Sequence, residues 1–141
     1  MAKRDAKVEL LRSVSLFSGM GRRELEDVAK LMDEVDVPAG KVLMKQGEPG
    51  HEMFVILKGK VLVERNGVKL DERGPGAALG EVALLSKGPR TATVTALEDS
   101  TLLYAGHREF HSLMDAHPSV RLCILDGLAT KIRALDEASV H

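Results

Sequence analysis

The chain lacks most of what would tie it to nucleic acid or to an oxidising compartment. Its single cysteine, Cys123, excludes an internal disulfide and suits a reducing compartment. Its 20 basic and 21 acidic residues leave a formal net charge of -1, whereas a nucleic-acid surface needs a basic excess. We therefore expect no direct nucleic-acid partner.

Long apolar runs are also missing. None of those in the sequence approaches the length of a membrane span. The first seven residues, Met-Ala-Lys-Arg-Asp-Ala-Lys, are not followed by an apolar segment, so no signal peptide is indicated. We expect a soluble cytoplasmic protein with no membrane partner, and 141 residues suit one domain better than two.

Hydrophobic spacing divides the chain into three parts. Helical spacing covers residues of about 6–32, with helices expected over 8–14 and 22–32. It returns over about 107–138, as a short helix and then a long one that contains Gly127. A glycine inside a helix costs roughly 1 kcal/mol relative to alanine, so Gly127 could mark a bend or a close packing contact.

Between these helical parts, over about 33–106, apolar and polar residues alternate and glycine turns are frequent. The pattern predicts about eight short strands, with Asn66-Gly67 as a hairpin turn. The expected strands include residues 35–37, 41–44, 53–57, 61–64, 68–70, 91–95 and 101–104. The fold class is therefore mainly β with flanking helices, and the strands form a closed or double-sheet antiparallel barrel.

One stretch, residues 74–95, combines features that suit an anion attached to a sugar. A glycine-rich turn precedes Glu81 and an apolar run that is too short for a full helix. Such a turn leaves backbone N–H groups pointing outward, which favours an anion. Arg90, nine residues after Glu81, can bring a permanently charged fork to the same place. The carboxylate can accept from hydroxyl groups.

The order of residues in this stretch is dense and specific. Gly80-Glu81 is followed by Ala83-Leu84 and then by Pro89-Arg90-Thr91-Ala92-Thr93-Val94. This pattern resembles the phosphate-binding cassette of the cyclic nucleotide-binding domain family, the sensor type of the catabolite activator and of the protein kinase A regulatory subunit. One departure is Leu79, where the family often has an aromatic residue.

The resemblance implies a fold and a set of ligand contacts. The fold is a double-stranded β-helix, a jelly-roll-like β-roll, with an N-terminal helical motif and C-terminal lid helices, in a single stand-alone domain over residues 1–141. The ligand is a cyclic nucleotide, cyclic AMP or cyclic GMP, with no cofactor and no metal. The implied binding residues are Gly80, Glu81, Val82, Ala83, Leu84, Pro89, Arg90, Thr91, Ala92 and Lys131.

Each polar residue of the cassette has an implied role. Arg90 would pair with the cyclic phosphate, helped by the N–H groups of Ala83 and Ala92, and Glu81 would accept the ribose 2′-hydroxyl. The Thr91 hydroxyl both donates and accepts, so it permits cyclic GMP, although we favour cyclic AMP. Glu81 could instead be a solvated carboxylate or a partner of Arg90, and Arg90 could form a surface ion pair.

The base would lie between the barrel and the last helix. By the family's spacing Lys131 covers it, with an aliphatic stem over the purine and a charged end in water. We expect its neighbours Ile132 and Leu135 to take part in ordinary helix packing. Four strand residues are candidates for the base pocket, or else core: Val61, Val63, Leu70 and Leu79.

Three further hypotheses compete with a sensor that has no catalytic activity. A metal enzyme is disfavoured, because His107 and His111 at i, i+4 have no third ligand at suitable spacing. Hydrolysis of the ligand would need an activated water, and the cassette supplies no group for it. A transcription regulator of the catabolite-activator type would share this sensor fold, but we expect no helix-turn-helix before His141 and hence no direct operator binding. A degenerate β-roll that serves as an interaction scaffold stays open.

Two further expectations concern partners and the cysteine. The signal would pass to a second copy of the chain or to a separate effector protein. Cys123 lies between apolar neighbours on the last helix, so we expect a buried small hydrophobe.

Overall fold

The structure, a computed structural model, describes residues 2–139. The chain divides into two compact units. A β unit consists of Met32–Phe110, and a helical unit consists of Met1–Leu31 with His111–His141. Each unit is considered by itself below.

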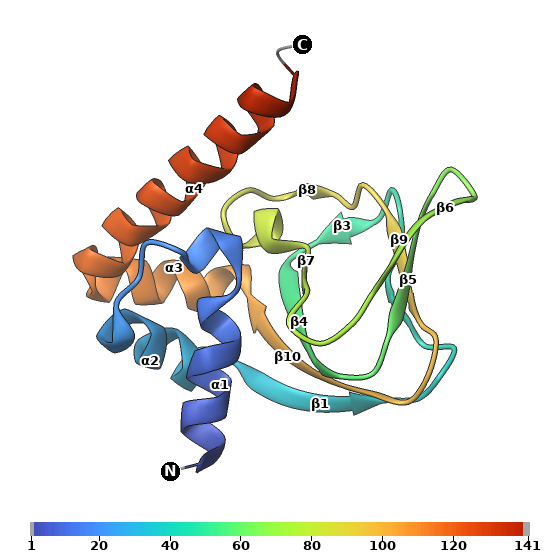
Figure 1. Cartoon of the computed structure of the whole chain (residues 1–141), viewed down its shortest axis with the longest axis horizontal. Coiled ribbons are helices and arrows are strands. Elements are labelled where there is room, and N and C mark those ends of the chain that lie inside the picture. Colours follow the sequence, from blue (N-terminus) through green and yellow to red (C-terminus); the bar gives the residue numbers. More distant parts are fainter. Residues whose placement is uncertain (1, 140–141) are drawn as a thin grey trace. The chain divides into compact units, whose positions relative to one another are not determined.

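The β unit contains two four-stranded antiparallel sheets and one short strand pair (Figure 1). The first sheet has the order β1 (Asp33–Val37), β10 (Ser100–Gly106), β4 (Glu52–Lys58) and β7 (Ala78–Leu79). The second has the order β2 (Val42–Met44), β9 (Thr93–Ala96), β5 (Val61–Arg65) and β6 (Val68–Arg73). The short pair joins β3 (Pro49–Gly50) to β8 (Gly88–Pro89).

The core of the β unit lies between the two sheets. Phe54 and Ile56 of β4, two positions apart, both point into it, as the two-residue period of a strand predicts. Side chains of both sheets therefore meet in one apolar cluster, which consists of Met44, Phe54, Ile56, Val61, Leu79, Val94 and Leu102. The predicted fold class, a mainly β roll with flanking helices, is confirmed.

The hairpin between β5 and β6 has the turn that its sequence predicts. Asn66 and Gly67 both have positive φ angles, 54° and 77°. Two consecutive positive φ angles are typical of a type I′ turn, which Asn-Gly favours. The returning strand β6 continues to Arg73, three residues beyond the predicted end at Leu70, because Asp71, Glu72 and Arg73 still pair with β5.

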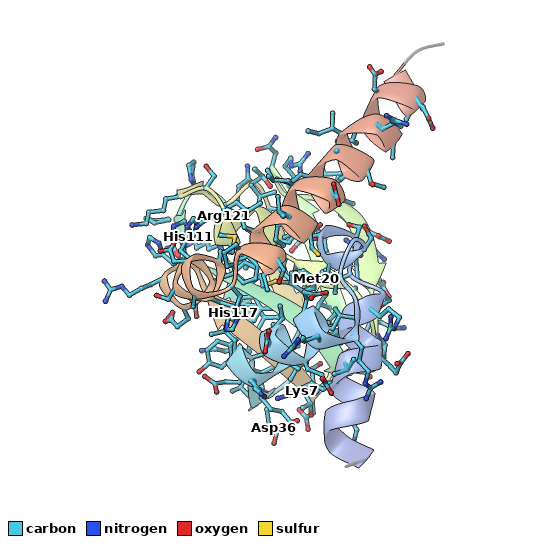
Figure 2. All side chains as sticks on the ribbon, turned by 90° about the vertical axis from the view of Figure 1, so that its left-hand side faces the viewer. Lys7, Met20, Asp36, His111, His117 and Arg121 are labelled. Atoms are coloured by element: carbon cyan, nitrogen blue, oxygen red, sulfur yellow. The ribbon has the colours of Figure 1, made fainter. Side chains whose placement is uncertain are left out.

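The helical unit is built from α1 (Ala2–Arg12), a 3₁₀ turn η1 (Ser15–Phe17), α2 (Arg22–Leu31) and α4 (Pro118–Ser139), together with the end of α3 (His107–Ala116). Helix α2 begins where the N–H of Gly21 donates to Oε1 of Glu24 at 2.8 Å. Helix α1 packs on α2, and Nζ of Lys7 donates to the Ala29 carbonyl at 3.4 Å (Figure 2).

Helix α4 packs closely against η1 at Gly127. A Cβ placed on Gly127 would collide with the carbonyl oxygen of Leu16. Of the two alternatives stated for this glycine, a bend or a close packing contact, the structure shows the close contact. Val120 and Ile124, on the same half of α4, are buried.

Two expectations for α4 are wrong. Ile132 and Leu135 were expected to pack, but they are 64% and 65% exposed. Cys123 was expected to be buried and is half-buried. The spacing identifies the side of the helix that carries the buried Val120 and Ile124, but it does not say how far along the helix that side is covered. None of the described helices combines the length and the apolar character that a membrane span needs.

Candidate functional site

The glycine-rich stretch folds as a strand, a tight turn and a single helical turn. Strand β7 ends at Leu79, and Gly80 takes a left-handed conformation with φ 70°. The 3₁₀ turn η2 (Glu81–Leu84) follows, as the short apolar run predicts. The chain returns through β8, bends at Thr91 and Ala92, and enters β9.

The side chains of η2 point in different directions. Leu84 is fully buried and Ala83 nearly so, whereas Val82 is 63% exposed. Glu81, the first residue of the turn, is half-buried. The N–H of Ala83, a predicted phosphate donor, already donates to the Gly80 carbonyl at 3.0 Å, as the i to i−3 pattern of a 3₁₀ turn requires. It can serve a second acceptor only through a bifurcated bond.

The guanidinium of Arg90 lies against two glycines. A Cβ placed on Gly80 would be 2.6 Å from Nη1 of Arg90. A Cβ placed on Gly50 would collide with Nε and lie 2.6 Å from Cζ. Any side chain at either position would therefore displace the guanidinium. We call Gly50 and Gly80 the glycine cradle.

The residues just before Gly50 hold the backbone of Arg90 by hydrogen bonds. Its N–H donates to the Glu48 carbonyl at 2.8 Å, and its carbonyl accepts from the N–H of Gly47 at 2.9 Å. Next to these bonds, Gly50 pairs with Gly88 in the β3–β8 ladder. The loop before β4 therefore fixes both the position of Arg90 and the room for its side chain.

The cradle leaves the guanidinium partly desolvated and incompletely paired. Nη1 of Arg90 is shielded from solvent and has no hydrogen-bond partner among the described residues. Burial lowers the pKa of Arg90, and the nearby Glu52 carboxylate partly offsets this. A buried donor without a partner costs free energy, more so when it is charged. An anion at Nη1 would remove that cost.

Gly50 and Arg65 were not predicted as site residues. Gly50 belongs to a run of turn residues, and its place beside Arg90 depends on the pairing of β3 with β8. Arg65 ends β5, and its Nε donates to the Thr91 carbonyl at 2.9 Å. Neither contact has a local sequence signal, because each joins residues at least 26 positions apart.

His107 and His111, at i and i+4, are the candidate metal ligands that the sequence offers. Nδ1 of His107 lies 2.9 Å from the Ala83 carbonyl, so this ring faces η2. In the described part of the chain no group of three or more His, Cys, Asp or Glu side chains could hold a metal ion.

The model of the cyclic nucleotide-binding domain matches residues 34–117, which is more than half of the chain. The chain belongs to the cyclic nucleotide-binding domain family. This match spans the cassette, the glycine cradle and the hairpin that carries Arg65.

Curated members of the family share this region within longer proteins. A cyclic nucleotide-gated potassium channel of Mesorhizobium japonicum is 38% identical over 113 residues, which cover 79% of this chain and 31% of the channel. A cAMP-dependent protein kinase regulatory subunit of Dictyostelium discoideum is 31% identical over 119 residues, with 79% and 36% covered. The chain spans about a third of the length of these two relatives.

Solved structures of the family share the fold. The N-terminal domain of a transcriptional regulator from Streptomyces coelicolor superposes with a TM-score of 0.85 at 31% identity, covering 94% of this chain and 96% of that one. The regulatory domain of Toxoplasma gondii PKA, in a co-crystal structure with cAMP, superposes with a TM-score of 0.73 at 28% identity, covering 84% and 47%.

The base-binding residues that the family comparison suggested are less well supported. Val61 and Leu79 are buried in the core cluster, and Val63 packs against it. For these three residues the alternative, that they are core, therefore holds. Leu70 is 51% exposed on β6. Lys131 is half-buried on α4 of the helical unit, and its place over a base stays a prediction.

Proposed function

We propose that this domain is a sensor that binds a cyclic nucleotide, cyclic AMP in preference to cyclic GMP, and leaves it chemically unchanged. The observation that carries the proposal is the Arg90 guanidinium in the glycine cradle, with a buried Nη1 that has no partner among the described residues. A forked cation in a partly desolvated place suits a phosphate, because charge-assisted bonds to phosphate oxygens are short and strong.

The cyclic phosphate is the group that we assign to Arg90. We assign two further donors to the phosphate, the N–H of Ala92 and the hydroxyl of Thr91, which follow Arg90 in the bend before β9. Gly80, Pro89 and the turn residues Val82, Ala83 and Leu84 complete the proposed site. These assignments follow the family pattern, and the cradle geometry supports the one for Arg90.

Glu81 is assigned to the ribose. Glu81 is the first residue of η2 and directly follows Gly80, which lies beside Nη1 of Arg90. A phosphate at Nη1 would therefore bring the adjoining sugar close to this carboxylate. An ionised carboxylate accepts from a hydroxyl and donates nothing, so it suits the 2′-hydroxyl of a ribose.

Signal transfer is assigned to α4, with Lys131 covering the base. A ligand shifts a closed state only by binding it more tightly than the open one. Helix α4 carries four exposed large apolar side chains: Leu122, Leu125, Ile132 and Leu135. Such residues suit contact with a partner, either a second copy of the chain or a separate effector protein in the cytoplasm.

The experiment is a calorimetric titration of the purified protein with cyclic AMP and cyclic GMP side by side. We expect one site per chain, with cyclic AMP binding more tightly. Chromatography of the recovered ligand should show unchanged cyclic nucleotide. The absence of heat and of a thermal shift with both ligands at millimolar concentration, in a folded sample, would overturn the proposal and favour a β-roll that serves as an interaction scaffold.

A further inference from the structure

The tip of the β5–β6 hairpin contacts the end of the cassette. Nε of Arg65, the last residue of β5, donates to the carbonyl of Thr91 at 2.9 Å. Thr91 directly follows Arg90, in the bend between β8 and β9. A guanidinium from a neighbouring hairpin therefore reaches the residue beside the proposed phosphate ligand.

Gln46 fastens this hairpin tip. Its Nε2 donates to Oδ1 of Asn66, and its Oε1 accepts from the N–H of Asn66, both at 2.8 Å. The backbone N–H of Gln46 donates to Oγ1 of Thr93 at 3.0 Å. The tip and the first residue of β9 are thus joined through one side chain and its backbone, which holds Arg65 near Thr91.

The Arg65 contact fixes a peptide group. The carbonyl of Thr91 and the N–H of Ala92 belong to one planar trans unit, so they point in opposite directions. When Arg65 holds the carbonyl, the direction of the Ala92 N–H is set. The preceding unit is held in the same way, since Gly47 donates to the Arg90 carbonyl and so sets the N–H of Thr91.

A charged donor on the carbonyl does more than orient the unit. Hydrogen bonds in a chain polarise one another, so a guanidinium on the carbonyl strengthens the N–H at the other end as a donor. Any effect of the exposed Arg65 on a bound phosphate would therefore pass through the backbone and would need no contact with the ligand.

We propose that Arg65 is a positioning residue of the phosphate site, which holds the Thr91–Ala92 peptide group so that the Ala92 N–H donates to one equatorial oxygen of the cyclic phosphate. This inference rests on the proposed function. It adds a residue that the cassette pattern does not contain and that lies 25 positions before Arg90.

The test uses the two phosphorothioate diastereomers of cyclic AMP, each of which replaces one equatorial oxygen by sulfur, a weaker acceptor. The wild type should distinguish them, because the two oxygens meet different donors. Arg65→Ala should weaken cyclic AMP binding about fivefold, as for a charged hydrogen bond at an exposed site, and should bring the two diastereomer affinities closer together. Arg65→Lys should not restore either property, since lysine lacks the Nε donor at that place.

The matched control is Arg73→Ala, which removes a guanidinium from the other strand of the same hairpin and away from its tip. It should leave both the affinity and the diastereomer ratio unchanged. If Arg65→Ala fails to fold, Asn66→Gly replaces it. Glycine keeps the positive φ angle and removes the one hydrogen bond that Nε2 of Gln46 donates to Oδ1, so the same changes should appear at smaller size.

Three results would overturn the inference. They are an unchanged affinity in Arg65→Ala, a loss that leaves the diastereomer ratio as in the wild type, and full rescue by Arg65→Lys, which would indicate charge alone. Failure of the proposed function is a distinct result, because the wild type would then bind no cyclic AMP; it would reject this role for Arg65 as well.

Discussion

Burial disfavours the charged form of one side chain in each unit. In the β unit it lowers the pKa of the Arg90 guanidinium, an effect that the Glu52 carboxylate partly offsets. In the helical unit it raises the pKa of the Cys123 thiol, and the carboxylates of Glu24 and Asp126 raise it further. Both groups are partly withdrawn from water. The nearby carboxylate favours the charged form of Arg90, whereas the two carboxylates near Cys123 disfavour its charged form.

The difference shows what turns a desolvated group into a binding site. Arginine stays protonated in proteins, so the cradle holds a lasting positive charge whose Nη1 has no partner among residues 2–139. Burial and the carboxylates of Glu24 and Asp126 oppose a negative charge on Cys123, so its neutral thiol is favoured. Both groups are partly buried. Arg90 differs in lying against the glycine cradle with a donor, Nη1, that has no partner among the described residues. The predictions below test that distinction.

The largest expected effect is on Arg90→Ala, which removes the cation and keeps the cradle. We expect a loss of about 100-fold or more in cyclic AMP affinity, because the phosphate would lose its charged partner. Calorimetry measures this loss, and circular dichroism with thermal unfolding checks the fold. Arg73→Ala, an exposed arginine of the β5–β6 hairpin, is the control. Equal affinity in Arg90→Ala and wild type would contradict the assignment.

The second effect keeps the cation and fills the cradle. Gly50→Ala places a Cβ where Nε and Cζ of Arg90 lie, so the flexible side chain has to leave. We expect about a tenfold weaker binding with a nearly unchanged melting temperature, because the obstacle is the end of one side chain. The control is Gly88→Ala, at the position paired with Gly50, where a Cβ meets nothing within 4 Å. Similar affinities for the two variants would refute the cradle.

The third effect concerns the sugar. Glu81→Gln should weaken cyclic AMP binding about fivefold, since the amide accepts less strongly from the 2′-hydroxyl than a carboxylate does. The same substitution should hardly change the binding of 2′-deoxy cyclic AMP, which lacks that hydroxyl. Titration of both proteins with both ligands forms a double-mutant cycle. Independent, additive losses would place Glu81 away from the ribose.

The smallest expected effect concerns the reactivity of the Cys123 thiol. Because the pKa of Cys123 is raised, little thiolate forms near neutral pH, and the thiol should react with iodoacetamide more slowly than a free cysteine. Asp126→Asn removes one of the charges that raise the pKa, so it should speed the reaction about twofold. Rates between pH 7 and 9 measure this, and a rate equal to that of free cysteine would contradict it.

Local patterns predicted the parts of the fold that depend on neighbouring residues. The short apolar run after Gly80 predicted the single turn η2, and Asn66-Gly67 predicted a tight hairpin turn. A short helix was predicted to begin at about residue 107, and α3 begins at His107. In each case the signal and the structure lie within a few residues of one another, so no tertiary contact is needed to decide them.

Long-range contacts were beyond reach of the same patterns. Gly50 reads as one more turn residue until the pairing of β3 with β8 places it against Arg90. Arg65 reads as the polar end of a strand until the hairpin tip meets Thr91. The Ala83 donor was predicted without knowing that a 3₁₀ turn would direct its N–H to Gly80.

The most direct test of the central claim is a crystal structure of the protein with cyclic AMP. The account predicts a phosphate oxygen within hydrogen-bond distance of Nη1 of Arg90, beside Gly50 and Gly80. A structure in which the nucleotide lies elsewhere, or in which the guanidinium turns to solvent while the phosphate rests on other groups, would contradict it.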